Sequence, residues 1–292
     1  PSQWSHRLRG SPTADADAPF GTPDDVVMDH CATVAEGSAA VRAELRDDRA
    51  ELGLPHSADT GAASSEATVD VFYRAPRADD SARGGVAAAV VADGGDVFVY
   101  IHGGYWQALS QRDSCFHART VLGALGCAAF VAVGYDLCPS VSFADLVVQV
   151  KNAVALVLRK FPRSRVHVCG HSAGGHLGAV VMCTDWAAEY GLVDVAETGR
   201  MGSFTLVSGI YDLRPIQASY VNDACRMTHA VAMATSPALL APSELRRLVP
   251  AGVPVIIAAG QHDSPAFRAQ SKAFCETLEE HTEVRATYVE LA

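Results

Sequence analysis

The 292-residue chain is 49% hydrophobic and carries 23 Lys and Arg against 33 Asp and Glu, a formal net charge of -10 at pH 7. This composition supports one substantial core and excludes a wholly disordered chain, because only 19% of the residues are charged. The negative charge argues against a nucleic-acid partner, and no apolar run reaches the roughly 18 residues of a membrane helix.

Residues 1–65 predict an irregular or helical N-terminal extension that ends in a linker. TADADAPFGTPDD is rich in turn formers, Val34–Leu54 has the charged, alanine-rich pattern of a helix, and ADTGAASSEA has a linker composition. We therefore expect the main domain to span residues 66–292. Because the chain begins with Pro1, we expect its natural start to lie upstream, and a targeting peptide there stays open.

Beyond the linker, predicted strands alternate with predicted helices. The strands are Thr68–Pro76, Asp96–Gly104, Ala128–Asp136, Arg165–Gly170, Ser203–Gly209, Val253–Gly260 and Val284–Leu291. The helices are Arg112–Leu125, Ser142–Phe161, the segment that follows Ser172, and Ala266–Glu280. Continuous apolar strands that alternate with helices predict an α/β fold, with a mostly parallel sheet covered by helices on both faces.

Eight cysteines are scattered singly along the chain. They form no C-x-x-C pair and the sequence has no H-E-x-x-H motif, so we expect neither a metal nor another cofactor. Several of them, such as Cys169 and Cys183, lie in apolar runs, where a thiol packs as a small hydrophobic group. We therefore expect a reducing, cytoplasmic compartment.

A serine stands between two glycines where one predicted strand turns into a helix. Gly170–Gly174 reads G-H-S-A-G and fits the G-x-S-x-G motif in its strand–turn–helix context. The sharp turn requires small flanking residues, lifts the Ser172 hydroxyl above the sheet and aims the Ala173 N–H at the same space. We interpret Ser172 as a nucleophile; the alternative is a chance pentapeptide in a chain rich in alanine and glycine.

A second glycine-rich segment, His102–Trp106, follows the strand DVFVYI. An HGGG-type loop at this position supplies backbone N–H donors to an oxyanion, and its glycines let the backbone approach the substrate. The alternative is a plain glycine turn whose aromatic residues pack in the core.

Five segments together resemble the kynurenine formamidases, the arylformamidase family of the α/β-hydrolase superfamily. They are HGGYW, YDLCP, GHSAGGHL, VSGIYDLRPI and GQHDSPAFRAQS. The likeness runs from about Phe72 to the last residue, PSQWSHRL at the start also resembles the family, and HGGYW is far more specific than G-x-S-x-G. The family hydrolyses N-formyl-L-kynurenine to kynurenine and formate during tryptophan degradation.

The resemblance implies a site and a substrate class. Ser172 would be the nucleophile and Asp263 the acid of the triad, acting on a small aryl formamide. The positions that would surround the oxyanion are Gly103, Gly104, Tyr105 and Ala173. Tyr105 and Trp106 are candidates for the walls of the aryl pocket, although large aromatic side chains also fill core space. A homodimer stays open as the assembly.

Two aspartates follow late strands and could serve as the acid, Asp212 in SGIYDL and Asp263 in AAGQHDS. Hydrolases of this fold carry the acid between the serine and the histidine in chain order, which allows either. Each could instead be a helix cap or a turn residue. We favour Asp263, because it begins the loop before the last helix and lies in a segment that matches the family.

The base is expected a few residues beyond the last strand, yet VRATYVEL ends next to Ala292. We therefore expect the triad histidine and the last elements of the fold to lie outside this chain. The histidines in the sequence are poor substitutes for this base. We expect His102 to brace the glycine loop, and His171 and His176 to pack or cap locally beside the elbow. His262 adjoins Asp263, so its side chain should point away from it, and His281 precedes the last strand, at the end opposite to the serine.

Two alternative functions stay open. One is a general carboxylesterase with an HGG-type loop, although Tyr-Trp after the glycines favours the formamidase. The other is a non-catalytic ligand-binding protein that keeps the α/β-hydrolase fold without the triad histidine.

Overall fold

A computed structural model describes the chain at residues 23–45, 50–56, 66–75 and 94–292. The turn-rich segment and the linker expected before Thr68 lie almost entirely outside these ranges. Strand β2 begins at Thr68, where the alternation of apolar residues predicts the start of a strand.

The described residues form an eight-stranded sheet in the order β1-β2-β4-β3-β5-β6-β7-β8. β2 is antiparallel to its neighbours β1 and β4, and the other neighbouring strands are parallel. The strands are β1 Ala50–Pro55, β2 Thr68–Tyr73, β3 Val97–Ile101, β4 Ala129–Val133, β5 Val166–His171, β6 Met201–Val207, β7 Pro254–Gly260 and β8 Arg285–Leu291. The predicted mostly parallel sheet is confirmed.

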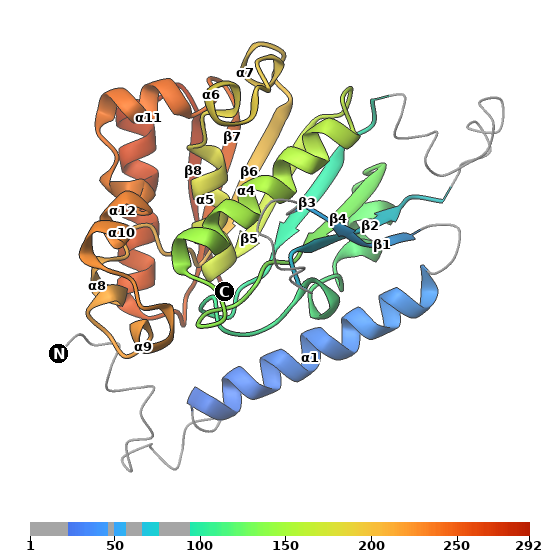
Figure 1. Cartoon of the computed structure of the whole chain (residues 1–292), viewed down its shortest axis with the longest axis horizontal. Helices are drawn as coiled ribbons and strands as arrows, with labels where there is room; N and C mark the ends of the chain where they lie inside the picture. The colour runs from blue at the N-terminus through green and yellow to red at the C-terminus, as the bar shows by residue number, and fades with distance from the viewer. Residues whose placement is uncertain (1–22, 46–49, 57–65, 76–93) are drawn as a thin grey trace.

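Helices cover both faces of the sheet, with α1 below the half that holds β1 to β4 and α12 beside β7 and β8 (Figure 1). The helical elements that build these layers and the connections are α1 Pro23–Glu44, η2 Gln111–Asp113, α3 Ala118–Gly123, α4 Phe143–Lys160, α5 Ala173–Met182, α6 Trp186–Tyr190, α7 Asp194–Glu197, α8 Arg214–Gln217, α9 Asn222–Cys225, α10 His229–Ala234, η3 Pro237–Leu239, α11 Pro242–Leu248 and α12 Pro265–His281.

The core has two parts, one on each face. The larger part packs α4, α5 and α12 against the strands, and the smaller part packs α1 and α3 against β2, β3 and β4. α4 illustrates the larger part: its apolar stripe faces the sheet, and Ser142 caps its first turn by accepting a hydrogen bond from Asp145 N. On the face of the sheet that holds the smaller part of the core, Ile256 of β7 and Leu291 of β8 are 42% and 44% exposed.

Two predicted elements differ from the structure. The single helix expected over Arg112–Leu125 is wrong, because the segment forms η2 and then α3. Ser110 caps the start of η2 by accepting a hydrogen bond from Arg112 N, and η2 ends at Ser114, whose N–H donates to Gln111 O. The helix expected over Val34–Leu54 ends at Glu44, and a strand that lies inside the predicted N-terminal extension, β1, pairs with β2 in the main sheet.

One buried carboxylate ties the N-terminal elements to the sheet. Asp70 of β2 is 1% exposed, pairs with the guanidinium of Arg42 in α1, and accepts a hydrogen bond of 2.8 Å from Gly53 N in β1. A charge removed from water must be paired to be tolerated, so Asp70 holds α1 and β1 in place. Val41 of α1, and Leu45 directly after it, add apolar packing on the same face.

This linkage predicts a specific loss of stability. Arg42→Gln leaves the Asp70 carboxylate buried without its cation, so the free energy of unfolding in urea should fall by about 3 kcal/mol. The matched control is Arg119→Gln, because Arg119 pairs with Glu44 of α1 while both side chains stay exposed; that change should cost less than about 1 kcal/mol. Equal losses in the two variants would show that the Asp70 pair does not hold α1.

Candidate active site

Ser172 occupies a strained elbow between β5 and α5. Its backbone has φ 56° and ψ -118°, a conformation that costs a non-glycine residue about 1–3 kcal/mol. A Cβ on Gly170 would lie 2.0 Å from Gly174 O, and a Cβ on Gly174 would lie 2.0 Å from Ile101 O. Only glycine fits at either position, so the spacing of the motif follows from contacts between main-chain atoms. A hydrogen bond of 2.8 Å from Ser172 N to Val207 O fixes the elbow to β6.

The N-terminus of α5 opens directly at this serine. The Ser172 carbonyl already accepts a helical hydrogen bond from His176 N at 3.1 Å, while its hydroxyl makes no capping bond to the described helix. The first N–H groups of a helix have no partner within it and carry partial positive charge. The hydroxyl and the Ala173 N–H therefore lie in the same small region, which can bind an oxyanion.

The glycine loop after β3 packs against the elbow. A Cβ on Gly103 would lie 2.9 Å from His171 O and 3.2 Å from Ser172 Cβ, so the loop passes in contact with the serine. Gly104 has φ +97°, and a Cβ there would lie 2.3 Å from Ala108 O. Both glycines are thus required by close approach, and they bring the backbone of the loop next to Ser172.

Tyr105 and Trp106 continue the loop with positive φ angles of 49° and 60°, yet their side chains go to different places. The Trp106 indole is 0% exposed and packs edge-on against Phe143 and His176, with ring centroids 5.0 Å and 5.3 Å away. It fills the core, which was the alternative to a place in the pocket wall. Tyr105 is partly buried; burial, and then the charges of Tyr220 and Asp263, raise its pKa to about 12.

Two buried histidines support this region as neutral groups. His102 donates from Nδ1 to Gly103 O at 2.9 Å and stacks on Tyr135, with ring centroids 4.2 Å apart. His176 donates from Nε2 to Thr235 O at 2.8 Å. Burial lowers the pKa of each to about 4, so both stay uncharged at neutral pH and are poor proton acceptors.

Asp263 lies in the loop after β7, at the same edge of the sheet as Ser172. Its Oδ2 accepts hydrogen bonds from Ser208 Oγ at 2.5 Å and from Gly260 N at 2.8 Å. Ser208, at the end of β6, has a positive φ of 49°. The sequence carries no signal for this serine, because its role arises only when the ends of β6 and β7 meet in the sheet.

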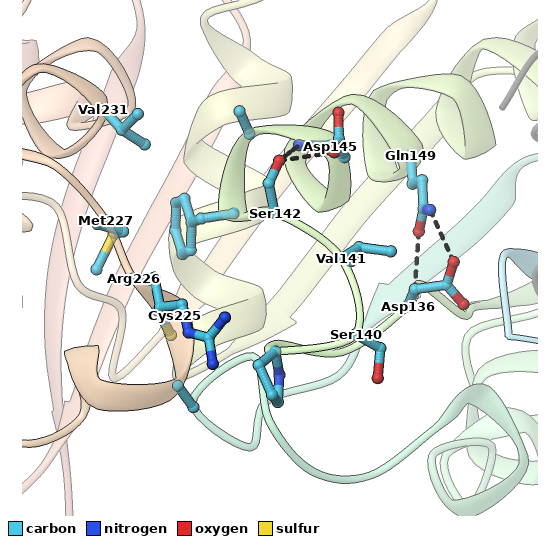
Figure 2. A pocket seen from close by; sticks show the side chains of 14 residues that line it. Asp136, Ser140, Val141, Ser142, Asp145, Gln149, Cys225, Arg226, Met227 and Val231 are labelled. Atoms are coloured by element: carbon cyan, nitrogen blue, oxygen red, sulfur yellow. Dashed lines mark hydrogen bonds between the residues drawn. The ribbon is translucent and has the colours of Figure 1, made fainter.

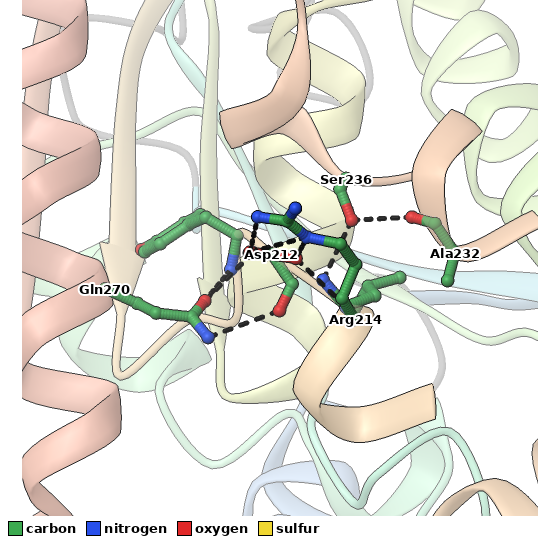
Figure 3. A network of polar contacts seen from close by, with 7 residues as sticks. Asp212, Arg214, Ala232, Ser236 and Gln270 are labelled. Carbon is green, nitrogen blue, oxygen red and sulfur yellow. Dashed lines mark hydrogen bonds and ion pairs between the residues drawn. The ribbon is translucent and has the colours of Figure 1, made fainter. Parts of the chain in front are cut away.

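Asp212 is engaged in a separate network, which Figure 3 shows. Its carboxylate forms an ion pair with Arg214, with Oδ2 2.7 Å from Arg214 Nη2. Gln270 of α12 fixes the same turn, because its Oε1 accepts hydrogen bonds from Tyr211 N at 2.8 Å and from Asp212 N at 2.9 Å. The Asp212 carboxylate is therefore neutralised locally, which favours Asp263 as the acid.

The direction of the parallel strands decides which of the candidate histidines lie at the same edge of the sheet as Ser172. β8 is parallel to β7, so Arg285 at its start lies at the edge opposite to Ser172. His281 ends α12 just before that strand and lies at the same opposite edge. His262 is on the correct edge, but it is exposed and directly precedes Asp263 in the chain.

A cavity of about 520 Å³ lies between the start of α4 and the α9–α10 segment (Figure 2). Its lining residues include Phe143, Cys225, Arg226 and Met227, and Ser172 is not one of them.

Over the described ranges no group of three or more His, Cys, Asp and Glu residues is arranged to hold a metal ion. None of the helices in those ranges is long and apolar enough to cross a membrane.

Comparisons with known proteins agree with this geometry. Residues 98–292 match the family described as alpha/beta hydrolase fold. The chain is 33% identical over 290 residues to a kynurenine formamidase of Salmo salar, covering 98% of this chain and 83% of that protein. It is 34% identical over 282 residues to a kynurenine formamidase of Danio rerio, covering 96% and 80%.

Solved structures show the same fold at lower identity. A candidate thioesterase from Silicibacter sp. superposes with a TM-score of 0.70 at 23% identity, covering 94% of this chain and 88% of that one. An esterase from the archaeon Pyrobaculum calidifontis superposes with a TM-score of 0.60 at 18% identity, covering 90% and 82%.

Proposed function

The chain belongs to the kynurenine formamidase family and has the α/β-hydrolase fold, and on this premise we propose that it hydrolyses the formamide of N-formyl-L-kynurenine to L-kynurenine and formate. The reaction would serve tryptophan degradation, and the binding partner of the protein would be its substrate, a small aryl formamide. The observation that carries the proposal is the contact between the Gly103 backbone and Ser172 at the N-terminus of α5.

In the mechanism we propose, Ser172 Oγ attacks the formyl carbon while the imidazole of the base takes the hydroxyl proton. The Ala173 N–H and the backbone of Gly103, Gly104 and Tyr105 surround the oxyanion of the tetrahedral intermediate and stabilise it. A protonated imidazole then gives its proton to the leaving arylamine, and water hydrolyses the formyl-serine. A formyl group carries only hydrogen beyond its carbonyl, so the close packing of Gly103 on Ser172 is compatible with this acyl group.

Asp263 is the acid in this proposal. The carboxylate accepts two hydrogen bonds within the described residues, and both go to Oδ2, so Oδ1 is the oxygen that we assign to the imidazole N–H. The donors Ser208 and Gly260 come from the ends of β6 and β7, which fixes the carboxylate in one orientation. A fixed carboxylate holds the imidazole in the tautomer and orientation that the serine needs.

The edge of the sheet also suggests where the base comes from. Leu291, the last residue of β8, is opposite Gly260, and its carbonyl accepts a hydrogen bond of 2.7 Å from Gln261 N. A histidine carried just after β8, where the family resemblance implies the base, would therefore emerge beside the loop that holds Asp263. We propose that the base is carried there.

A cytoplasmic location is part of the proposal. The seven cysteines whose side chains the structure describes carry free thiols, and free thiols are characteristic of a reducing compartment.

The position of the base gives the first test. Residues 1–292 should be compared with the same chain carrying, after Ala292, the segment that follows the last strand in the Salmo salar relative. Hydrolysis of N-formylkynurenine should be slower without the segment by a factor on the order of 10⁶, because triad members act as a unit. Replacing the histidine of the added segment by alanine should abolish the gain, and circular dichroism should confirm that each protein is folded.

Equal activity with and without the segment would contradict this proposal and make His171 and His262 the first residues to replace. If both proteins cleave simple aryl esters and leave N-formylkynurenine intact, the carboxylesterase alternative holds. Binding of N-formylkynurenine with no hydrolysis of any ester or formamide would support the non-catalytic alternative.

The nucleophile is tested in the active form of the protein. Ser172→Ala should lower the turnover of N-formylkynurenine by a factor on the order of 10⁶ and remove labelling by a fluorophosphonate probe. Ser110→Ala is the control, because Ser110 only caps the short helix η2. Labelling that persists in Ser172→Ala would assign the reactive serine elsewhere.

The two aspartates are distinguished by the same assay. Asp263→Asn should lower kcat by roughly 10⁴, because an amide at this position favours the wrong tautomer of the base. Asp212→Asn is the matched change in the neighbouring loop and should disturb only the local pair with Arg214. The opposite ranking of the two variants would make Asp212 the acid.

A further inference from the structure

A second serine and histidine meet at the edge of the sheet opposite to Ser172. Ser203 of β6 and His167 of β5 are opposite each other in the parallel pairing of the two strands, and His167 Nδ1 lies 2.8 Å from Ser203 Oγ. His167 is the second residue of β5, whereas Ser172 follows the last residue of that strand. The hydrolysis that we propose at Ser172 uses neither Ser203 nor His167.

The carboxylate of Asp96 faces the other ring nitrogen of His167. Asp96 directly precedes β3, and its Oδ2 lies 3.6 Å from His167 Nε2. Arg165 holds this carboxylate in place, because its Nε lies 3.0 Å from Asp96 Oδ1 and its Nη2 lies 3.1 Å from Oδ2. The neighbouring strands β3, β5 and β6 thus bring a carboxylate, an imidazole and a serine into one chain of contacts.

The carboxylate decides which nitrogen of the neutral imidazole carries the proton. An ionised carboxylate can only accept hydrogen bonds, so we assign the proton to Nε2, which faces Asp96. Nδ1 then presents its lone pair to Ser203, and the serine hydroxyl donates to it. In this arrangement an imidazole can take the serine proton as the oxygen attacks. The 3.6 Å between Nε2 and Asp96 is long for a hydrogen bond, and such contacts often tighten only when a substrate binds.

His167 is neutral at neutral pH and is still in contact with solvent. Burial, which the Asp96 carboxylate opposes and the Arg165 charge reinforces, lowers the pKa of His167 from its usual value. The His167 side chain is 21% exposed and that of Asp96 is 35% exposed, whereas His102 and His176 are almost completely enclosed. An imidazolium formed at His167 therefore keeps both a carboxylate and water beside it.

Gly202 makes room for the imidazole ring beside Ser203. The pairing of β5 and β6 shifts by one residue at this point, since Val166 is opposite Met201 while His167 is opposite Ser203. A Cβ on Gly202 would lie 2.6 Å from His167 Cε1, so the ring packs directly on the glycine backbone. The shifted pairing and the missing side chain together hold the ring next to the serine hydroxyl.

The face of the sheet next to Ser203 has an exposed apolar position that can contact a small ester. Ser203 and Thr205 project from the same face of β6, because side chains alternate along a strand. Thr205 is opposite Ile256 of β7, which is 42% exposed, and Ile256 is opposite Thr287 of β8, which is exposed as well. A short acyl group or an aryl ring on Ser203 can therefore lie against Ile256.

We propose that Ser203, His167 and Asp96 form a second nucleophilic site, at which Ser203 takes the acyl group of a small activated aryl ester. Ser203 Oγ attacks the acyl carbon while its proton passes to His167 Nδ1. The bond between that carbon and the aryloxy oxygen then breaks, and the departing aryloxide takes the proton from His167. The products are an acyl-serine and a phenol, and water removes the acyl group by the same steps.

The roles and the rate follow from the geometry. Ser203 and His167 are the catalytic residues of this site, and Asp96 is a positioning residue that acts through His167. Ser203 lies inside a strand and not at the start of a helix, so its acylation should be much slower than reaction at the elbow serine, where a helix N-terminus stabilises the oxyanion. The site is therefore expected to be visible only when Ser172 has been replaced.

The test uses residues 1–292 with Ser172→Ala as the parent protein, so that the elbow serine contributes nothing. The probe is p-nitrophenyl acetate, the rate is the protein-dependent release of p-nitrophenol, and mass analysis of an acid-quenched digest locates the acetyl group. The acetyl group should be found on Ser203. Ser203→Ala or His167→Gln, added to the parent, should each lower the release by about 10²-fold, which is a usual contribution of a general base.

Two further variants separate chemistry from structure. Thr205→Ser, added to Ser203→Ala, places a serine hydroxyl on the same face of β6 but two positions from the contact with His167, and it should not restore the release. Asp96→Asn should lower the rate at saturating ester roughly tenfold, a modest effect because this carboxylate is 35% exposed and partly screened by water. The half-saturating ester concentration should stay the same, because Asp96 does not contact the ester.

Release that is equal in the parent and in a folded Ser203→Ala or His167→Gln protein would overturn the proposal. Acetyl groups found on lysines or other side chains but not on Ser203 would overturn it as well. Thermal unfolding shows whether each variant is folded, and the position of the acetyl group in the parent decides the question even if a variant unfolds. The result is independent of the hydrolysis proposed at Ser172, because that serine is absent from every protein in the test.

Discussion

The site depends on main-chain atoms that approach too closely for any side chain. At the carboxyl ends of β3 and β5 the backbone of Gly174 lies so near Ile101 O that a Cβ would come within 2.0 Å of it, and Gly103 is in similar contact with His171. These contacts force the strained backbone of Ser172, with φ 56°. Such strain persists only where the surrounding structure holds it, and here the sheet does so through the bond from Ser172 N to Val207 O.

The same close packing makes two of the histidines near the serine, His102 and His176, poor proton acceptors. His102 and His176 are buried by the loop and the helix that they support, and loss of water lowers the pKa of each to about 4. Burial, and then the charge of His171, lower the pKa of His117 to about 4. Protonation is unfavourable for such groups, whereas a base must accept a proton during the reaction. An imidazole that enters from the open edge near Asp263 avoids this penalty.

The sequence predicts those parts that repeat a local pattern. The one-sided stripe of α4 and the alternation of strands and helices were sufficient for the parallel sheet, and the glycines around Ser172 predicted the elbow because their spacing reflects main-chain contacts. β1 was missed, because it is an edge strand whose pairing with β2 depends on the buried Asp70. The Ser208 contact to Asp263 was also beyond the sequence, since it arises only from packing between distant segments. For Trp106 the sequence left a pocket wall and a place in the core both open, and packing puts the side chain in the core.

The Tyr105–Trp106 backbone is held on both of its sides. One side of the loop rests on the elbow through Gly103, and the other is bonded to Cys138 and Cys225. Positive φ angles at Tyr105 and Trp106 are tolerated only while both sides hold the loop. A loop held in this way has little freedom to adjust when α9 moves. A small displacement of α9 is therefore expected to reach the N–H groups at the serine.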